Sequence, residues 1–385
     1  MMSKEKRRVP KLRFPGFTED WEQRKADYIF KSVTDKGYPE LPVLSASQEL
    51  GMVYRDQNGI DIQHDKKNET SYKRVLPGQF VIHLRSFQGG FAYSEIEGIT
   101  SPAYTVMSFK NSSEQYGLFW KHVFKSETFI KRLETITYGI RDGRSISFSD
   151  FKSLVLQYPS LSEQKLIGDL ITIIEKGIIL HQRKLDNLKL KKKALLQKLF
   201  PKNGERYPEL RFPGFTDAWE QHKLKSIANM IVAGGDIDKN KIKESGTYPV
   251  IANALSKDGI VGYYDDSYRI EAPAVTVTGR GDIGVAKARH QNFTPVVRLL
   301  SLTTAHDVDF VEHAINNLKI VSESTGVPQL TVPQLSNYKI HITSIIEERK
   351  IGLFISKLDN LITLHQRKLD QLKLQKKALL QQMFV

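Results

Sequence analysis

Two small groups of residues in this chain have the types and spacing that could support catalysis or cofactor binding. Gly279, Gly281 and Gly284 follow an apolar run in a GxGxxG pattern, which is typical of dinucleotide or methyl-donor sites. The chain then reaches Pro295 too soon for the crossover helix that such a site requires, and the first half has no counterpart. We therefore expect no cofactor in this loop.

Asp150, Glu163 and Lys165 loosely match a nuclease carboxylate–lysine set. Ser162 and Glu163, however, lie where a long helix is expected to begin, and there a serine can cap the helix and a carboxylate favours its dipole. The ten histidines show no metal-binding spacing, and the sequence contains neither a Walker loop nor a Ser/His/Asp set. The sequence thus predicts a chain without catalytic residues, without a metal site and without a cofactor of its own.

Polar, glycine-containing loops offer a different chemistry, namely contact with nucleic acid. One such loop follows each of two predicted buried strands, at 80–82 and 274–277, and a second lies late in each half. Glycine lets the backbone approach a ligand, and Arg, Gln and Ser can bond base edges or phosphates. Ordinary hairpin turns with polar groups in solvent are the alternative. The residues predicted to contact DNA are Ser45, Ser47, Gln48, Arg85, Ser86, Gln88, Gly89, Tyr138, Arg141, Arg144, Asn253, Lys257, Thr278, Arg280, Thr325 and Gln329.

The overall charge favours the nucleic-acid interpretation. The chain of 385 residues has a formal net charge of +14 and a pI near 9.5, which favours nucleic acid over an anionic membrane, although solubility alone also explains such a charge. It contains no cysteine, which excludes disulfides and thiolate chemistry and fits a reducing cytoplasm. No apolar run approaches the roughly 20 residues that span a bilayer. We expect a cytoplasmic protein with no membrane partner.

Two repeated segments must position these loops. Residues 12–24 and 210–222, which begin with the box LRFPGF, share 10 of 13 positions, and residues 181–200 and 365–384 share 16 of 20. The boxes are 198 residues apart and the helical segments 184, so the two middles differ in length by 14 residues, and they show no comparable identity. Each half therefore runs from a box through a variable insert to a helix, as in an internal duplication with exchangeable inserts.

Each helical segment carries a heptad stripe that must be buried against a partner. The stripe is apolar except at His181 and Lys192 in the first segment and His365 and Lys376 in the second. Such polar positions set the register of a helix pair, and a ligand or switch role for the histidines is the alternative. The predicted seam and subunit interface consists of Ile174, Ile178, His181, Leu185, Leu188, Leu195, Leu358, Ile362, His365, Leu369, Leu372 and Leu379.

The predicted fold is α+β, with two globular mixed α/β domains joined by two long antiparallel helices in a pseudo-two-fold internal duplication. A helix of 38 residues would be roughly 57 Å long, enough to hold two readers over adjacent turns of one DNA duplex. The predicted divisions are 1–160 for the first box and domain, 161–200 for the first helix, 201–345 for a linker with the second box and domain, and 346–385 for the second helix.

This frame resembles the specificity subunit of type I restriction-modification enzymes. The resemblance is carried by the LRFPGF box with its tryptophan, by the helix endings ALLQKLF and ALLQQMF, and by PVLSASQELG, RSFQGGFAYSEIEGITSPAY and STGVPQLTV in the inserts, and it covers nearly the whole chain. It implies two target recognition domains, each reading one half of a split, asymmetric DNA site through the major groove. The paired helices would fix the spacer between the halves.

The resemblance also implies partners. These are double-stranded DNA, two modification subunits that bind S-adenosylmethionine and methylate an adenine in each half-site, and two restriction subunits with the ATP- and Mg-dependent motor and nuclease. Two other classes remain open. A stand-alone DNA-binding regulator would more usually gain symmetry by dimerising, and a fused methyltransferase should carry an Asn/Asp-Pro-Pro-aromatic tetrapeptide, which this sequence lacks.

Overall fold

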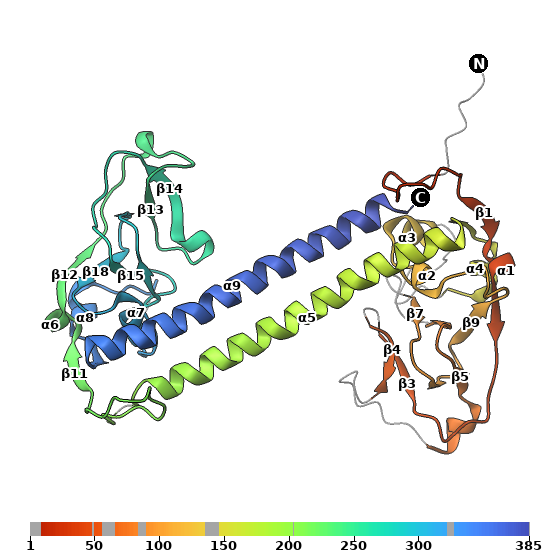
Figure 1. Ribbon diagram of the computed structural model, residues 1–385, viewed down its shortest axis with the longest axis horizontal. Helices are drawn as coiled ribbons and strands as arrows, with labels where there is room; N and C mark the ends of the chain where they lie inside the picture. Colours follow the sequence, from red (N-terminus) through yellow and green to blue (C-terminus); the bar gives the residue numbers. More distant parts are fainter. Residues whose placement is uncertain are drawn as a thin grey trace. The chain divides into compact units, whose positions relative to one another are not determined.

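The two long helices each take part in both compact units of this chain. The computed structural model describes residues 9–47, 50–55, 66–83, 90–134, 146–202, 204–321 and 327–384. Unit 1 comprises residues 1–181 and 368–385, and unit 2 comprises residues 182–367. Helix α5 (Leu161–Leu199) begins in unit 1 and ends in unit 2, whereas α9 (Ile345–Gln382) begins in unit 2 and ends in unit 1 (Figure 1).

The first unit is built on a four-stranded antiparallel sheet with the order β2–β9–β6–β7. Three further strand pairs, β1–β10, β3–β4 and β5–β8, accompany it. The strands are β1 (Glu22–Lys25), β2 (Phe30–Val33), β3 (Leu44–Ser47), β4 (Gly51–Tyr54), β5 (Lys73–Val75), β6 (Phe80–Ile82), β7 (Phe91–Tyr93), β8 (Gly98–Thr100), β9 (Thr105–Phe109) and β10 (Val155–Tyr158). The helices are α1 (Ala26–Ile29), the 3₁₀ turn η2 (Lys66–Ser71), α2 (Gly117–Val123), α3 (Glu127–Glu134) and α4 (Phe148–Ser153).

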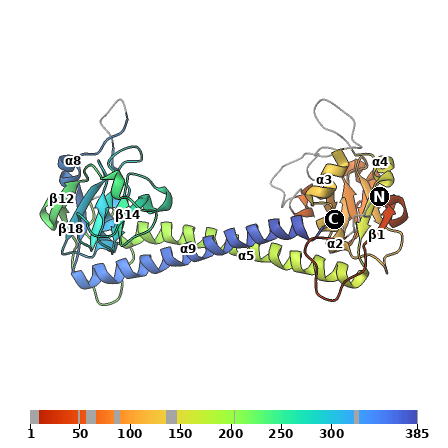
Figure 2. The same cartoon turned by 90° about the horizontal axis from the view of Figure 1, so that it is seen from above.

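The second unit repeats this sheet with the order β12–β18–β15–β16. The pair β11–β19 and the three-stranded sheet β14–β13–β17 accompany it, and α8 packs beside β12 (Figure 2). The strands are β11 (Glu220–Lys223), β12 (Ala228–Ala233), β13 (Tyr248–Ile251), β14 (Ile260–Tyr264), β15 (Ala274–Val277), β16 (Ala286–Arg289), β17 (Thr294–Pro295), β18 (Leu300–Thr304) and β19 (Lys339–Ile342). The helices are α6 (Leu224–Ile227), η3 (Lys239–Lys241), η4 (Ser256–Gly259), α7 (Val308–Asn316) and α8 (Val332–Asn337).

Both sheets are buried on two faces because alternate residues of a strand point to opposite sides. In β6, Phe80 and Ile82 belong to the large aromatic core of unit 1, whereas Val81 belongs to a smaller core with Leu44 and Met52. In unit 2 the same alternation separates residues 275 and 277 from residue 274. Two inserts without sequence identity therefore fold around the same kind of sheet, since apolar pattern is kept where residue identity is not.

The first LRFPGF box joins the start of one long helix to the end of the other. The Nε and Nη2 atoms of Arg13 donate to the two carboxylate oxygens of Glu163, in the first turn of α5, over 2.7 and 2.9 Å. The backbone N–H of the preceding Leu12 donates to the carbonyl of Gln382, the last residue of α9, over 2.9 Å. Unit 1 thus holds the beginning of α5 beside the end of α9.

The second box makes the equivalent contacts with the helix ends exchanged. Arg211 donates to both carboxylate oxygens of Glu347 in the first turn of α9, over 2.7 and 2.8 Å. The N–H of Leu210 donates to the carbonyl of Lys198, near the end of α5, over 2.8 Å. Each box therefore contacts the helix that follows its own insert and the last turn of the helix that belongs to the other half.

A cluster of three aromatic rings completes each of these junctions. In unit 1 the ring of Phe119 in α2 lies 5.8 Å from Trp21 of the box and 5.8 Å from Phe384, just beyond the end of α9. In unit 2 the cluster consists of Phe310, Trp219 and Phe200. The box tryptophan and the phenylalanine repeated at each helix end are thus core residues, and each contacts a phenylalanine from the insert.

These contacts confirm the predicted mixed α/β class, the duplication and the antiparallel packing of the helices. Within unit 1, for example, Glu175 of α5 pairs with Lys376 of α9, and two residues further along α5, Gly177 lies against Leu372. One expectation at the helix start was wrong. Helix α5 begins at Leu161, so Ser162 lies inside the first turn and not at the capping position.

Candidate nucleic-acid interface

In unit 2 the structure brings three separate segments together at the end of strand β15. The backbone N–H of Gly279 donates to the side-chain oxygen of Asn253 over 2.8 Å, and its carbonyl accepts from the N–H of Leu330 over 2.9 Å. Next to this contact, Arg280 and Gln329 form an isolated antiparallel bridge. Four residues predicted to contact DNA from sequence therefore lie on adjoining segments, since Thr278 precedes Gly279 directly.

Glycine and a buried hydroxyl give this loop its shape. A Cβ atom on Gly279 would lie 2.2 Å from the carbonyl oxygen of Arg298, so no side chain fits there. Gly281 and Gly284 have φ values of +78° and +82°, which L-residues rarely adopt. The hydroxyl of Thr278 accepts from the N–H of Val285 over 3.0 Å and donates to the carbonyl of Asp282. Thr278 is buried, so its polar group serves the loop itself.

The same geometry accounts for the GxGxxG pattern. The strands before and after it, β15 and β16, pair antiparallel with Val277 opposite Ala286. The pattern therefore lies in a β-hairpin, whereas a dinucleotide site requires a strand followed by a helix. The glycines are explained by the hairpin turn.

Three of the predicted residues in unit 2 present their side chains to solvent. Arg280, Gln329 and Lys257 are all exposed. Lys257 has a φ of 50°, and the next residue, Asp258, pairs with Lys287 of β16, which lowers the pKa of the Asp258 carboxyl. Exposed cationic and amide groups such as these are suited to bonding phosphates and base edges.

In unit 1, the described part of the predicted interface is smaller. Ser45 and Ser47 lie half-buried in β3, and the Ser47 hydroxyl accepts from the N–H of Leu50 over 3.3 Å. Strands β6 and β7 pair antiparallel, as β15 and β16 do in unit 2. The predicted residues Gln48, Arg85, Ser86, Gln88, Gly89, Tyr138, Arg141 and Arg144, together with Thr325 of unit 2, lie outside the described residues.

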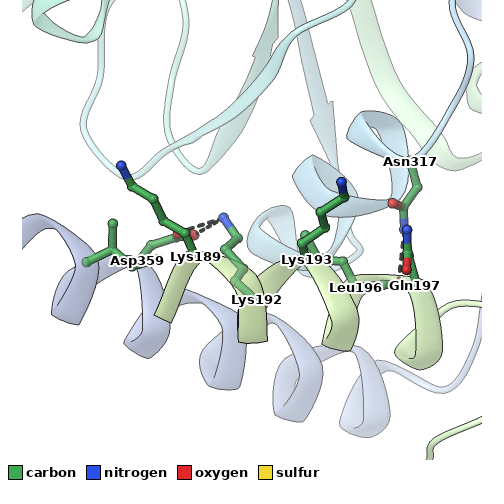
Figure 3. Close-up of a pocket in the computed structure, with 8 residues that line it drawn as sticks. Lys189, Lys192, Lys193, Leu196, Gln197, Asn317 and Asp359 are labelled. Atoms are coloured by element: carbon green, nitrogen blue, oxygen red, sulfur yellow. Dashed lines mark hydrogen bonds and ion pairs between the residues drawn. The ribbon is translucent and has the colours of Figure 1, made fainter. Parts of the chain in front are cut away.

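Sequence reasoning identified Lys192 and Lys376 as polar seam positions but missed the carboxylate and the histidine that complete a polar cluster where each insert meets the helix pair. In unit 2 the ammonium of Lys192 in α5 lies 2.6 and 2.7 Å from the two carboxylate oxygens of Asp359 in α9 (Figure 3). His313 of α7 lies 3.9 Å from the same carboxylate. In unit 1, Lys376 lies 2.7 Å from Glu175, and His122 of α2 lies 3.9 Å from that carboxylate.

Comparison with known families decides what kind of protein carries this frame. The family model for the type I restriction modification DNA specificity domain matches residues 19–190 and again residues 216–374. The two matches together cover most of the chain and correspond to its two halves. The chain belongs to this type I specificity family.

Specificity subunits are also its relatives among curated proteins. The Mycoplasma pneumoniae protein described as type I specificity subunit S.MpnORF507P is 29% identical over 147 residues, which are 37% of this chain and 40% of the relative. A second from the same organism, S.MpnORF89P, is 28% identical over 164 residues, 41% of this chain and 49% of the relative. Each alignment thus spans less than half of the curated relative.

A solved structure agrees with the specificity-family fold over the full length. The crystal structure of the type I restriction-modification system S subunit from M. genitalium matches with a TM-score of 0.68, covering 98% of this chain and 99% of that one. The identity is 15%, so this likeness concerns the fold.

The residues predicted for the helix seam of this specificity-family chain are all at least half-buried. Leu185 and Leu369 are buried, and the other ten seam residues, His181 and His365 among them, are half-buried. Among the described residues no cluster of three or more potential ligands could hold a metal ion, and no described helix is long and apolar enough to cross a membrane.

Proposed function

We propose that this chain is the DNA-recognition subunit of a type I restriction-modification enzyme and that it reads a bipartite, asymmetric site. Each unit would read one half through the segment that follows β6 in unit 1 or β15 in unit 2 and the loops beside it. The observation that carries this proposal is the combination of one repeated frame with two different loop sequences. Both units share the sheet order and the box contacts, but the sequences RSFQGG and TGRGD differ, so the half-sites should differ too.

The spacing between the half-sites would be set by α5 and α9. Both helices enter both units, and each box holds the first turn of one helix beside the last turn of the other. Because each box contacts both helices, each recognition domain would be held at one position along the helix pair. Adding or removing one base pair of spacer moves a half-site by about 3.4 Å along the DNA and about 34° around it. Rigid helices that fix the distance between the two domains would therefore select one spacer length.

The exposed faces of the helices support a scaffold role. Leu180 and Leu374 in unit 1 and Leu364 and Leu190 in unit 2 occupy equivalent positions, and all four are exposed. Exposed leucines on a helix are typical of a docking surface. One pair in each unit fits two modification subunits, which would supply S-adenosylmethionine binding and methyl transfer. The two restriction subunits would supply ATP- and Mg-dependent translocation and cleavage, and this chain would be non-catalytic.

Methylome sequencing tests the proposal. The chain would be expressed with its neighbouring modification subunit in a host that lacks adenine methylation, before and after replacement of one insert, residues 25–154. We expect a split adenine-methylated motif in which only one half changes. A complex that forms but yields no methylated motif would contradict the proposal and favour a stand-alone DNA-binding regulator. The variant Arg280→Gln with Gln329→Ala should weaken modification of the site, whereas Glu271→Gln, on an exposed loop of the same unit, should not.

A further inference from the structure

The two polar clusters at the junctions of inserts and helices occupy equivalent positions. Glu175 and Asp359 are 184 residues apart, as are Lys192 and Lys376, which is the offset of the helix repeat. The histidines come from the inserts, where α2 contains FWKHV and α7 contains FVEHA. Within these five residues only the phenylalanine and the histidine are shared. The phenylalanine belongs to the aromatic cluster at the junction. The histidine is therefore the second residue that both inserts share where this helix meets α5 and α9.

Each cluster combines groups from three elements. In unit 2 the carboxylate comes from α9, the lysine from α5 and the histidine from α7. In unit 1 the carboxylate comes from α5, the lysine from α9 and the histidine from α2. The carboxylate and the lysine meet only when the two helices are in one register. A histidine that faces this ion pair therefore faces groups of both helices, which come together only in the correct helix register.

Both imidazoles are buried and uncharged. The exposed fraction of the side chain is 0% for His122 and 3% for His313. Burial lowers the pKa of His122 to about 3 and that of His313 to about 4. Nε2 of His122 lies 3.1 Å from the hydroxyl of Thr172, which leaves Nδ1 to face Glu175. At 3.9 Å neither histidine forms a hydrogen bond with its carboxylate, and the buried Nδ1 of His122 has no hydrogen-bond partner, so each ring is held by packing with one nitrogen facing the carboxylate.

In unit 2 the helix that carries the histidine also holds the candidate DNA hairpin. Glu312 of α7 accepts from the N–H of Ala288 over 2.8 Å. Asn316 of α7 accepts from the N–H of Ala286 over 2.8 Å and donates to its carbonyl over 3.0 Å. Ala286 and Ala288 lie in β16, the strand that follows the loop with Arg280. The polar side chains of α7 thus connect the helix pair on one side to the hairpin on the other.

We propose that His122 and His313 are positioning residues, which set the place of each recognition domain on the helix pair by facing the interhelical carboxylate–lysine pair. This inference rests on the proposed function, because its consequence is the accuracy of the spacer between the half-sites. An insert would fit this frame when the helix after its sheet carries phenylalanine and histidine three residues apart. The hairpin would then lie at a fixed place whatever bases it reads.

The two histidines face their carboxylates with different ring nitrogens, which provides a matched test. Nδ1 of His122 faces Glu175, and the amide nitrogen of asparagine can take that place; Nε2 of His313 faces Asp359, and the amide nitrogen of glutamine can take that one. The variants are H122N and H122Q in unit 1, and H313Q and H313N in unit 2. Val275→Ala, in the sheet of unit 2, serves as a control for loss of stability without a change at the junction.

The measurement is binding of the full chain, in complex with its modification subunit, to DNA in which the spacer is lengthened or shortened by one base pair. For the native chain we expect such a change to reduce affinity about tenfold, because the half-site moves by about 3.4 Å. H313N and H122Q should reduce this discrimination to about threefold or less, while H313Q, H122N and Val275→Ala keep it. Equal discrimination in all variants would overturn the positioning role. A native complex that binds no bipartite site would instead contradict the proposed function.

Discussion

Arg13 and Glu163 lie 150 residues apart in sequence and form a bidentate ion pair whose carboxylate is fully buried. The same pair recurs as Arg211 and Glu347 in unit 2, with the same two nitrogens and a carboxylate of equal burial. A planar guanidinium can satisfy both oxygens of a carboxylate at once, which an ammonium cannot. The box is therefore kept in both halves because its arginine neutralises a carboxylate that the first helical turn buries, Glu163 in α5 and Glu347 in α9.

Removal of either arginine should unfold its own unit preferentially. Arg13→Ala leaves Glu163 charged and buried without a partner, which costs about 3–5 kcal/mol, and Arg13→Lys should recover only part of this. Hydrogen exchange of each unit, with urea denaturation, measures the effect. Arg24→Ala is the control, because its pair with Glu22 is more than half exposed and such pairs contribute about 0–1 kcal/mol. Equal losses for Arg13→Ala and Arg24→Ala would disprove the assigned role.

The interhelical lysines should differ in importance between the two units. The side chain of Glu175 is 14% exposed and that of Asp359 is 39% exposed. Burial raises the pKa of Glu175, but the positive charges of Lys125 and Lys376 and the hydrogen bond from Lys376 bring it below the ordinary value. Lys376→Met should therefore cost about 2–3 kcal/mol of unfolding free energy and Lys192→Met about 1 kcal/mol or less. Denaturation of the two variants side by side tests this order, and a larger loss for Lys192→Met would contradict it.

The frame and the antiparallel packing of its helices were predicted from sequence, but the backbone contact of each box with the end of the other half's helix was not. The repeat identifies Arg13 with Arg211 and predicts two equivalent helices. It contains no information on whether Leu12 bonds the end of α5 or, as the structure has it, Gln382 at the end of α9. That choice follows from the antiparallel packing of the helices, a long-range contact whose signal is the heptad stripe alone.

The candidate interface was predictable at the level of loops and less so at the level of side chains. The apolar runs at 80–82 and 274–277 are strands, each paired antiparallel with the next strand of its unit, and a hairpin loop follows the second. The Thr278 hydroxyl bonds backbone groups of its own loop, and Asn253 bonds the backbone of Gly279 in another segment, and no sequence pattern specifies either contact. The signal for His122 and His313 was present, as phenylalanine and histidine three residues apart in each insert. Two shared residues are too few to detect before the helices are superposed on equivalent strands.

Burial of the two junction histidines should make stability fall at mildly acidic pH. In the unfolded chain each imidazole binds a proton below its ordinary pKa of 6.5, whereas the folded protein keeps His313 neutral to about pH 4 and His122 to about pH 3. The unfolded state then binds more protons, so stability decreases as the pH falls from 6.5 toward 4, by on the order of 1 kcal/mol per pH unit for each group. Urea denaturation at pH 7, 6 and 5 measures this slope. The variant H122N with H313Q should have a shallower slope, and an unchanged slope would contradict the assignment.

A single backbone difference explains why Gln164 and Glu348 are not interchangeable, although they occupy equivalent helix positions. The Gln164 oxygen accepts from the N–H of Tyr116 over 3.0 Å, and its amide nitrogen donates to the carbonyl of Pro159 over 3.0 Å. Glu348 instead accepts from the N–H of Thr343 over 3.3 Å and contacts His306 over 2.9 Å. Proline has no N–H, so the side chain beside Pro159 must donate, whereas the side chain beside Thr343 can accept.

Gln164→Glu should therefore be the more harmful exchange. It places a carboxylate against the carbonyls of Pro159 and Glu114 at a fully buried position, which we expect to cost about 3 kcal/mol or to raise the pKa of the new acid until it binds a proton. Glu348→Gln keeps one acceptor oxygen for the backbone and should cost about 1–2 kcal/mol. Urea denaturation at pH 8 and pH 5 separates the two, because protonation restores a donor and Gln164→Glu should then regain stability relative to the native chain. A loss that is independent of pH would show that a donor at this position is not what Pro159 requires.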